Sequence, residues 1–175
     1  MINKILVAVD RFSDNQSVYD SAVCLAKSTG AKIMLLHVIT ESDSSYPILP
    51  TYAYYPIMDD RDYEVYQEKL LEYKQLGIDF LANLTHNATD AGVSAEYTQL
   101  IGNPGRSICE LASTWGADLI LVGSRGLKGL KEMFLGSVSN YVTHHAPCSV
   151  LIVRNQTSPK QETVVAEQRE LINQF

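Results

Sequence analysis

The architecture of this protein can be read outward from residues 122–139, which run Val122-Gly123-Ser124-Arg125-Gly126-Leu127-Lys128-Gly129-Leu130-Lys131-Glu132-Met133-Phe134-Leu135-Gly136-Ser137-Val138-Ser139. An apolar run, Asp118–Val122, leads into this stretch, and a helical pattern with Val138, Tyr141 and Val142 follows it. The order therefore predicts a buried strand, a glycine-rich loop and a helix. Glycine lets a backbone approach a ligand closely, and the first amides of a helix lack intrahelical partners. Because the helix dipole is also positive there, an anion such as phosphate is the favoured ligand.

Two common phosphate-binding motifs do not describe this stretch. No Gly-Lys-Ser/Thr closes it, as a Walker A loop requires, and the Gly-x-Gly-x-x-Gly of dinucleotide-binding folds is absent. Under the phosphate interpretation, Ser137 and Ser139 offer hydroxyl donors, and Arg125, Lys128 and Lys131 offer positive charge. The alternative interpretation is an ordinary strand-to-helix connection that contains several turn glycines.

The spacing of the glycines is more specific than their number. Gly123, two residues, Gly126, nine residues and then Gly136-Ser137 resemble the nucleotide-binding signature of the universal stress protein family, in its ATP-binding, UspA-like branch. Four further segments resemble the family's first strand with its terminal aspartate, its second strand, its turn into the third helix and its last strand: Lys4–Asp10, Leu35–Val38, Gly102–Ile108 and Pro147–Val153. The resemblance covers residues 1–154 as one domain, with a gap around 41–60.

Apolar strands alternate with helical patterns along the chain, which predicts a parallel sheet with helices on both faces. The family resemblance implies a single-domain α/β fold with an open five-stranded parallel sheet of strand order 3-2-1-4-5, the adenine nucleotide alpha-hydrolase-like architecture. In that order the first and fourth strands are neighbours. Asp10 and Gly123 are therefore expected side by side, at the switch point where open α/β sheets bind ligands. The expected strands are 3–9, 32–39, 93–101, 118–122 and 148–153.

Ordinary capping signals delimit the expected helices. Ser13 or Asp14 is expected to cap the first helix, which Gly30 ends. A helix over 60–91 is long for such a domain, so a kink at Gly77 and a frayed start are alternatives to one straight helix. Its apolar and aromatic stripe, at alternating steps of four and three, is interpreted as core or dimer contact: Tyr66, Leu70, Tyr73, Gly77, Phe80 and Leu84.

Two segments fall outside the repeating pattern. Residues 41–60 contain three prolines and four tyrosines, and they leave the second strand on the side where ligands bind. A lid or partner contact near the nucleotide is one interpretation, and an insertion that packs on itself is the other. The tail, 155–175, is polar and then amphipathic, so it is either a short helix at 163–173 or a frayed terminus.

Composition limits the classes of function. The chain has 175 residues, which suits one domain with a sizeable core, and a net charge of −6. The acidic charge argues against nonspecific binding to nucleic acid or to anionic membranes, and no apolar run reaches the length of a transmembrane helix. The N-terminus enters a strand directly rather than a signal peptide, so a cytoplasmic location is expected. Cys24, Cys109 and Cys148 are expected there as buried, reduced thiols.

The resemblance also implies roles for individual residues. Asp10 is expected to accept hydrogen bonds from the ribose hydroxyls, and Val38 to meet adenine through its backbone and its apolar side chain. From the residues alone, Asp10 can equally be a helix-start aspartate, Val38 a core residue and Arg125 a solvent-exposed side chain. The other expected nucleotide contacts lie at strand ends, in the glycine loop and at the start of the last helix: Ala8, Val9, Val122, Gly123, Ser124, Arg125, Gly126, Gly136, Ser137, Val138 and Ser139.

These features favour a dimeric regulatory or stress-response module that binds ATP or AMP, with Mg²⁺ able to accompany ATP. No nucleophile, base and orienting group are recognisable, so a binding module is favoured over an enzyme, and slow ATP hydrolysis is the most activity expected. His37 is interpreted as a satisfied core or edge histidine. Neither His144 nor His145 has a partner at metal spacing, so no structural metal is expected. A sensor of a cyclic adenine dinucleotide and a nucleotide-transfer enzyme are the alternatives for the same pocket.

The last strand, 148–153, carries the expected contact with a partner. The resemblance implies that this strand pairs with its own copy across a two-fold axis. Its apolar edge, Val150–Val153, fits this, because an uncovered edge of that kind invites pairing. A homodimer is therefore expected, with a higher oligomer as an open alternative.

Overall fold

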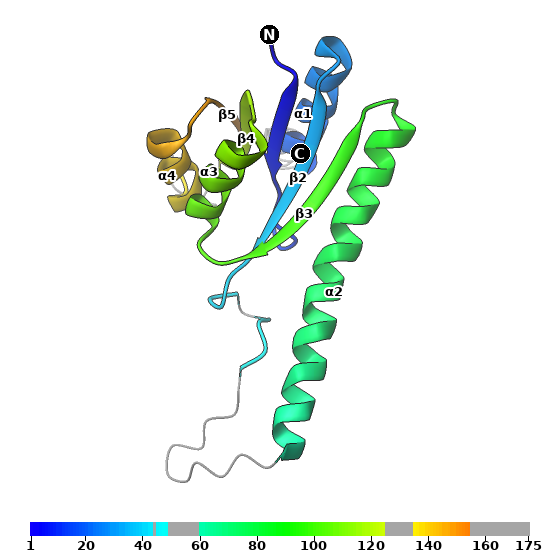
Figure 1. Ribbon diagram of the computed structural model, residues 1–175, viewed down its shortest axis with the longest axis vertical. Helices are drawn as coiled ribbons and strands as arrows, with labels where there is room; N and C mark the ends of the chain where they lie inside the picture. The colour runs from blue at the N-terminus through cyan, green and yellow to red at the C-terminus, as the bar shows by residue number, and fades with distance from the viewer. Residues whose placement is uncertain (44, 49–59, 125–134, 155–175) are drawn as a thin grey trace, which may run out of the picture.

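Figure 1 shows the computed structural model of the chain, which describes residues 1–43, 45–48, 60–124 and 135–154. Within these residues, five strands alternate with four helices, as the sequence predicts, and the boundaries differ from the expected ones by a few residues. The elements are β1 (Lys4–Ala8), α1 (Gln16–Thr29), β2 (Lys32–Ile39), α2 (Asp60–Asp90), β3 (Ala95–Ile101), α3 (Pro104–Trp115), β4 (Leu119–Ser124), α4 (Ser137–His145) and β5 (Ser149–Arg154).

All five strands are parallel and are hydrogen-bonded in the order β3-β2-β1-β4-β5. This confirms the fold expected from the sequence. The chain builds from β1 outward to β3 and then returns to add β4 and β5 on the other side of β1. The direction of winding therefore reverses between β1 and β4, which makes the two central strands the boundary between the two halves of the sheet.

A single carboxylate ties the amino ends of the two central strands together. Oδ2 of Asp118, just before β4, accepts hydrogen bonds from the backbone N–H groups of Asn3 (2.8 Å) and Lys4 (3.0 Å) at the start of β1. These two bonds lower the pKa of Asp118. The amino ends of β1 and β4 are thus joined by this side chain as well as by the backbone hydrogen bonds between the two strands.

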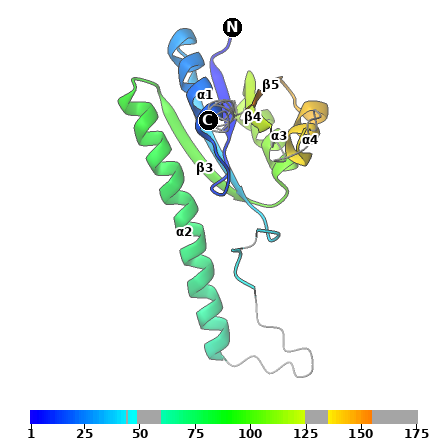
Figure 2. The same ribbon diagram turned by 180° about the vertical axis from the view of Figure 1, so that it is seen from behind.

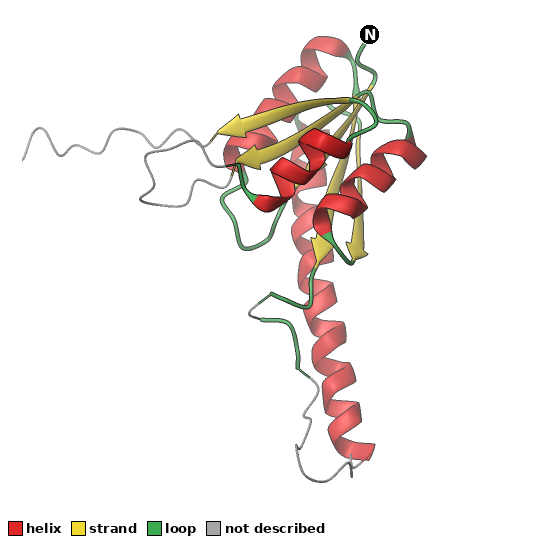
Figure 3. Cartoon of the chain, turned by 90° about the vertical axis from the view of Figure 1, so that its left-hand side faces the viewer, coloured by secondary structure: helices red, strands yellow, loops and turns green. Residues whose placement is uncertain are grey.

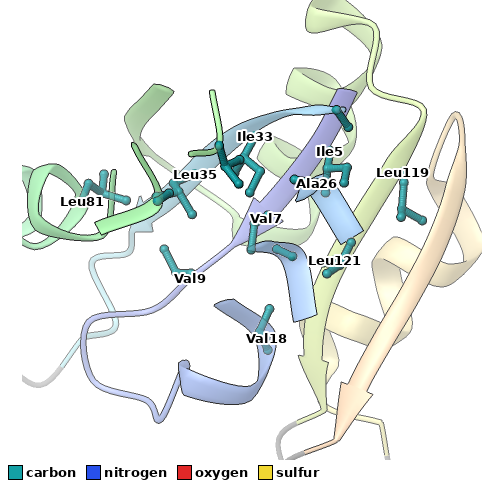
Figure 4. Close-up of a cluster of buried hydrophobic side chains, with 14 residues drawn as sticks. Ile5, Val7, Val9, Val18, Ala26, Ile33, Leu35, Leu81, Leu119 and Leu121 are labelled. Carbon is teal, nitrogen blue, oxygen red and sulfur yellow. The ribbon is translucent and has the colours of Figure 1, made fainter. Parts of the chain in front are cut away.

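Alternate residues of the strands enter two separate cores, one on each face of the sheet. On one face, strand residues pack against α1 and α2, as Figure 4 shows for Ile5, Val7, Ile33, Leu35 and Leu121. On the other face, strand residues pack against α3 and α4: Leu6, Met34, Leu36, Ile120 and Val122. Burying each such side chain contributes roughly 1.5–3 kcal/mol. Both faces are covered, which explains why the strands are apolar runs rather than alternating ones.

The long helix α2 is continuous from Asp60 to Asp90, with no interruption at Gly77. Gly77 is instead a point of close approach to the sheet. A Cβ at this position would collide with the side-chain amide of Gln99 on β3 and would lie 3.1 Å from Cδ2 of His37 on β2. The glycine therefore permits contact between helix and sheet, and neither the predicted kink nor a break is needed.

The aromatic stripe of α2 is core from Tyr73 onward. Tyr73 is 5% exposed, and Phe80 and Leu84 pack against the core that α2 shares with α1. Leu81 and Ala88 are fully buried as well, although they lie outside the predicted stripe. The first half of α2 projects past the ends of the strands (Figure 2 and Figure 3). The interpretation as core is therefore confirmed for the part of the stripe that reaches the sheet.

Two local expectations need correction. The N-cap of α1 is Asn15, because the chain makes a further turn between β1 and the helix, although Asp14 does accept a hydrogen bond from the N–H of Gln16 (3.1 Å), the first residue of α1. The three cysteines are free thiols, but Cys24 is exposed because it lies on the solvent side of α1. Cys109 and Cys148 are half-buried, and burial raises the pKa of both thiols.

Some expectations concern residues that the structure does not describe. The lid interpretation concerns 41–60, of which 44 and 49–59 lie outside the described residues, and the alternatives for the tail concern 155–175, all of which lie outside them. In the described part of the chain, no helix has both the length and the apolar character needed to cross a bilayer.

A glycine sets the spacing between α3 and α4. A Cβ at Gly105, in the first turn of α3, would lie 2.8–3.0 Å from Cδ1, Cγ and Cβ of Tyr141 on α4. These atoms form the base of the side chain, so the ring cannot relieve the contact by moving its far end. Tyr141 also stacks on His145, with ring centroids 4.1 Å apart and 11° between the planes. The position of α4 therefore depends on its packing against α3.

Replacing Gly105 with alanine tests this contact. We expect the free energy of unfolding in urea to fall by about 1–3 kcal/mol, because the added methyl group forces α3 and α4 apart. Higher helix propensity offsets at most about 1 kcal/mol. In a Tyr141→Ala background, which removes Cγ and Cδ1 but keeps Cβ, the same substitution should cost less, and a double-mutant cycle measures the difference. Equal destabilisation in both backgrounds would contradict the close contact.

Candidate functional site

The carboxyl edge of the sheet opens where β1 and β4 separate. The last paired residues of these two strands are Val7 and Leu121. Beyond them β1 stays with β2, where the N–H of Val9 donates to the carbonyl oxygen of Leu36 (2.9 Å). β4 continues beside β5 as far as Ser124. The sheet therefore parts at its switch point, and the predicted groups Ala8–Asp10 and Val122–Ser124 lie at the ends of the two diverging strands.

Asp10 follows β1 at this edge and orders the loop that leads into α1. Its carboxylate accepts hydrogen bonds from the N–H of Phe12 (3.1 Å) and from the hydroxyl of Ser13 (2.7 Å). Its carbonyl oxygen accepts from the N–H of Ser13 (3.0 Å). An ionised carboxylate offers sites for about four hydrogen bonds, and both of these described donors come from the same turn. Asp10 is thus a loop residue at the switch point and not the N-cap of α1.

Asn15 closes the same loop from its other end. Its Oδ1 accepts from the N–H of Asp10 (2.9 Å), and its Nδ2 donates to the carbonyl oxygens of Asp10 (2.6 Å) and Ser13 (2.9 Å). Sequence reasoning missed this residue. The available signal was an asparagine beside the expected helix start, which predicts a cap rather than a bond back into the loop.

A second residue that sequence reasoning missed, Asp43, fixes the chain where it leaves β2. Its carboxylate accepts from the N–H and the hydroxyl of Thr40 (3.2 and 3.0 Å) and from the hydroxyl of Tyr73 on α2 (3.0 Å). Burial, followed by the bond to Asp43, raises the pKa of Tyr73. Cζ of Arg11 lies 5.0 Å from the ring centre of Tyr73. The loops after β1 and β2 therefore meet on one side chain of α2.

A hollow of about 350 Å³ lies at the carboxyl ends of β2 and β3. Val38 on β2 is two residues before the first residue that lines it. Gly102, on the opposite wall, has a φ of +148°, which favours glycine, and its N–H donates to the carbonyl oxygen of Ile39 (3.0 Å). The space is at the lower end of the size range of small-molecule sites. The lining residues are Thr40, Glu41, Ser42, Ile101, Gly102, Asn103 and Pro104.

The buried side chain of His37 supports the end of β1. It is 2% exposed, and its Nδ1 lies 3.3 Å from the carbonyl oxygen of Val9. A neutral imidazole must therefore carry its proton on Nδ1 to donate this bond. Burial lowers the pKa of His37, while the bond to Val9 and the charges of Asp10 and Asp43 act in the opposite direction. The interpretation of His37 as a satisfied core histidine is confirmed.

The first turn of α4 contains the expected phosphate contacts. Gly136 is the N-cap and provides no side-chain cap for the amides that open the helix. Ser137 is exposed and Val138 is half-buried. Ser139 is 2% exposed, and its hydroxyl donates to the carbonyl oxygen of Gly136 (3.1 Å). In this structure the hydroxyl of Ser139 therefore bonds to the helix start itself.

The glycine at the end of β4 has a structural reason of its own. A Cβ at Gly123 would lie 3.2 Å from Cγ2 of Val18, so the glycine lets α1 pack closely on the strand end. The predicted contacts Arg125 and Gly126 lie outside the described residues, as do the basic side chains Lys128 and Lys131. The positive charge expected beside a phosphate is therefore not part of the described site.

These features define a class of protein. The chain is an open, doubly wound α/β protein whose central strands part at the switch point, with an ordered aspartate loop on one side and a helix start after the other. Proteins of this class bind ligands at the carboxyl edge of the sheet. Among the described residues, no group of three or more histidine, cysteine, aspartate or glutamate side chains is placed to hold a metal ion.

Within that class, the chain belongs to the universal stress protein family, whose sequence model matches residues 1–154. A universal stress protein of Synechocystis is 37% identical over 152 residues, which cover 87% of this chain and 97% of the relative. The universal stress protein YxiE of Bacillus subtilis is 40% identical over 156 residues, which cover 88% of this chain and 100% of the relative.

Solved structures show the same fold. The universal stress protein UspA of Lactobacillus plantarum superposes with a TM-score of 0.60 at 25% identity, covering 87% of this chain and 98% of the other. A family member from Arabidopsis thaliana, solved with AMP bound, superposes with a TM-score of 0.59 at 21% identity, covering 91% of this chain and 97% of the other. The universal stress protein of Archaeoglobus fulgidus in complex with dAMP superposes with a TM-score of 0.54 at 22% identity, covering 87% of this chain and 99% of the other.

The lowered pKa of His37 predicts a pH-dependent stability. The folded state keeps His37 neutral below its ordinary pKa of 6.5, so between 6.5 and the folded-state pKa the unfolded chain binds more protons. The free energy of unfolding should therefore fall as the pH is lowered through this window, by up to about 1.4 kcal/mol per pH unit. Urea unfolding of the wild type and of His37→Gln at a series of pH values isolates this contribution.

The control for this experiment is His86→Gln. His86 lies on the exposed side of α2, with 75% of its side chain accessible, and should leave the pH dependence close to that of the wild type. A wild-type slope that persists unchanged in His37→Gln would show that another group is responsible.

Proposed function

We propose that the protein is a regulatory module of the stress response that binds ATP or AMP where β1 and β4 separate. The observation that carries the proposal is the parting of the two central strands beyond Val7 and Leu121, with the ordered Asp10 loop at the opening. Family members solved with AMP, dAMP and cAMP support an adenine nucleotide as the ligand class.

The proposed roles follow from the position of each group. Asp10 accepts hydrogen bonds from the ribose hydroxyls, since an ionised carboxylate is an acceptor only. Adenine lies against Val38, beside the hollow at the ends of β2 and β3. The amides at the start of α4, after the N-cap Gly136, bind the phosphates together with the strand end at Gly123 and Ser124. Ala8, Val9, Val122, Ser137, Val138, Ser139 and the undescribed Arg125 and Gly126 complete the proposed contacts.

The proposal does not require a resident metal ion. When ATP arrives with Mg²⁺, the phosphate oxygens and water supply most of the ligands that this cation prefers. Affinities measured with Mg²⁺ and with a chelator then show whether the cation contributes. The protein is proposed to act in the cytoplasm as a binding module.

The first test is to identify what the purified protein carries. The protein is prepared without added nucleotide and denatured, and the released material is analysed by chromatography and mass spectrometry. We expect ATP or AMP from the wild type, and an affinity at least about tenfold lower in Gly136→Val, whose side chain blocks approach of a phosphate to the amides of α4. Gly136 has φ −59° and ψ 158°, so valine adds bulk without backbone strain.

The matched control is Thr143→Val, which adds no bulk at the start of α4 and should release the same nucleotide as the wild type. Circular dichroism verifies that each variant is folded. Wild-type protein that releases no nucleotide and binds neither ATP nor AMP on titration would overturn the proposed function. Binding of a cyclic adenine dinucleotide in place of ATP would instead support the alternative of a sensor.

We further propose a homodimer through the edge of β5. Within the described residues, β4 is the strand paired with β5, so the other edge of β5 offers backbone donors and acceptors to a second copy. Leu151→Lys places a charge on this edge, where the leucine is 39% exposed, and should convert dimer to monomer at micromolar concentration. Size-exclusion chromatography with light scattering measures the change.

The control for the dimer is Leu71→Lys on α2, where the leucine is 69% exposed. This variant should keep the wild-type mass. A wild type that is monomeric under the same conditions would remove the dimer from the proposal and leave nucleotide binding untouched.

A further inference from the structure

We propose that Asn15 is a positioning residue that holds Asp10 in the conformation that recognises the ribose hydroxyls, and so makes binding depend on the ribose. The inference rests on the proposed nucleotide-binding function and concerns a residue outside the expected set of contacts. It follows from where the side chain of Asn15 makes its hydrogen bonds.

Asn15 occupies a helix N-cap but does not act as a cap. An N-cap asparagine ordinarily accepts a hydrogen bond from the second or third amide of its helix. Asn103 does so on α3, where its Oδ1 accepts from the N–H of Arg106 (3.1 Å). Asn15 holds the equivalent place on α1 and makes no such bond. The same residue type at two helix starts of one chain therefore serves two different purposes.

The hydrogen bonds of Asn15 go back to the loop instead. Oδ1 accepts from the N–H of Asp10 at 2.9 Å, and Nδ2 donates to the carbonyl oxygen of Asp10 at 2.6 Å. One side chain thus binds both backbone polar groups of the residue proposed to contact the ribose. The backbone of Asp10 cannot rotate on either side without breaking one of these bonds. A second donor bond, to the carbonyl oxygen of Ser13 at 2.9 Å, fixes the far end of the turn.

The direction of the carboxylate is set within the turn that Asn15 closes. The N–H of Phe12 and the hydroxyl of Ser13 each bind one carboxylate oxygen of Asp10, at 3.1 and 2.7 Å. These donors are correctly placed only while residues 10–13 keep their turn. Loss of Asn15 therefore removes the part of the carboxylate's orientation that the turn provides, even though Asn15 touches none of the carboxylate oxygens in the described contacts. The ribose would then lose an aligned acceptor, while contacts to adenine and phosphate would persist.

The test compares ATP with 2′,3′-dideoxy-ATP, which lacks both ribose hydroxyls, by isothermal titration calorimetry. The wild type should bind ATP at least about tenfold more tightly than the dideoxy analogue, because charge-assisted hydrogen bonds to Asp10 are lost. In Asn15→Ala this ratio should fall to within about threefold, with the affinity for the analogue unchanged within about twofold. A merely structural defect would weaken both nucleotides alike and preserve the ratio.

The Asn15→Asp variant tests the donor group of the Asn15 side chain, Nδ2, apart from its acceptor, Oδ1. It has the same size as asparagine and keeps an acceptor for the N–H of Asp10, but it places a second oxygen against the two carbonyls that Nδ2 now binds. It should lose the preference for ATP as the alanine variant does, and it carries the test where alanine does not yield folded protein. Asn87→Ala is the matched control, because the side-chain amide of Asn87 donates to an exposed neighbour on the same helix, Asn83 (3.3 Å), near the end of α2 and away from the Asp10 loop.

The outcomes distinguish this inference from the function on which it rests. If the wild type prefers ATP and the Asn15 variants keep that preference, Asn15 is not a positioning residue, and nucleotide binding stands. If the wild type binds ATP and the dideoxy analogue equally, the ribose role of Asp10 fails and the inference fails with it. If neither nucleotide binds to the wild type, both the function and the inference are overturned.

Discussion

Beyond Val7 and Leu121 the two central strands no longer share hydrogen bonds, and each follows its other neighbour. A parallel sheet with helices on both faces has no open surface in its middle, so a ligand can reach its backbone only at the strand ends. Asp118 ties the amino ends of β1 and β4 together, and the divergence is therefore confined to the carboxyl edge. Every group proposed to touch the nucleotide belongs to a segment that leaves or enters this edge.

Three glycines, which carry no side chain, let the helices around that edge pack closely on their neighbours. Gly77 lets α2 reach β3, Gly105 lets α3 meet Tyr141 of α4, and Gly123 lets α1 approach β4. None of these three has the positive φ that usually explains a glycine, since the described glycines with positive φ are at other positions. These glycines instead allow a helix to approach the neighbouring strand or helix closely. In a fold of this kind, the distance between layers at a few points decides where the helix ends lie, and the helix ends carry the binding groups.

The sequence was sufficient for the strands, the helices and their order. Apolar runs of parallel strands are unambiguous, and the glycine spacing of 123–137 resembles that of one family closely enough to supply the strand order. The chain's membership in that family confirms the inference. The glycine loop itself lies largely outside the described residues, so its role remains a prediction.

Other features depend on tertiary contacts that no local pattern records. Ser13, Asp14 and Asn15 are all good caps, and only the fold of the loop selects Asn15 and then turns its side chain away from the helix. A glycine inside a helical stripe, such as Gly77, is typical of a kink. Its actual role comes from its contact with Gln99, which lies on a strand more than twenty residues later in the chain. Cys24 is exposed because one turn of α1 places it on the outer side. Each error concerns which neighbour a residue meets in space.

The length of α2 has a mechanical consequence. From Gly77, where the helix meets the sheet, to its first residue at Asp60 the helix extends for about 25 Å, at 1.5 Å per residue. A rigid rod of that length works as a lever: a tilt of about 5° at the sheet displaces its free end by about 2 Å. The pivot lies against Gln99 and His37, and His37 in turn bonds to Val9, the residue before Asp10. Any tilt of α2 about this contact would therefore displace its first turn by more than it displaces the residues beside Asp10.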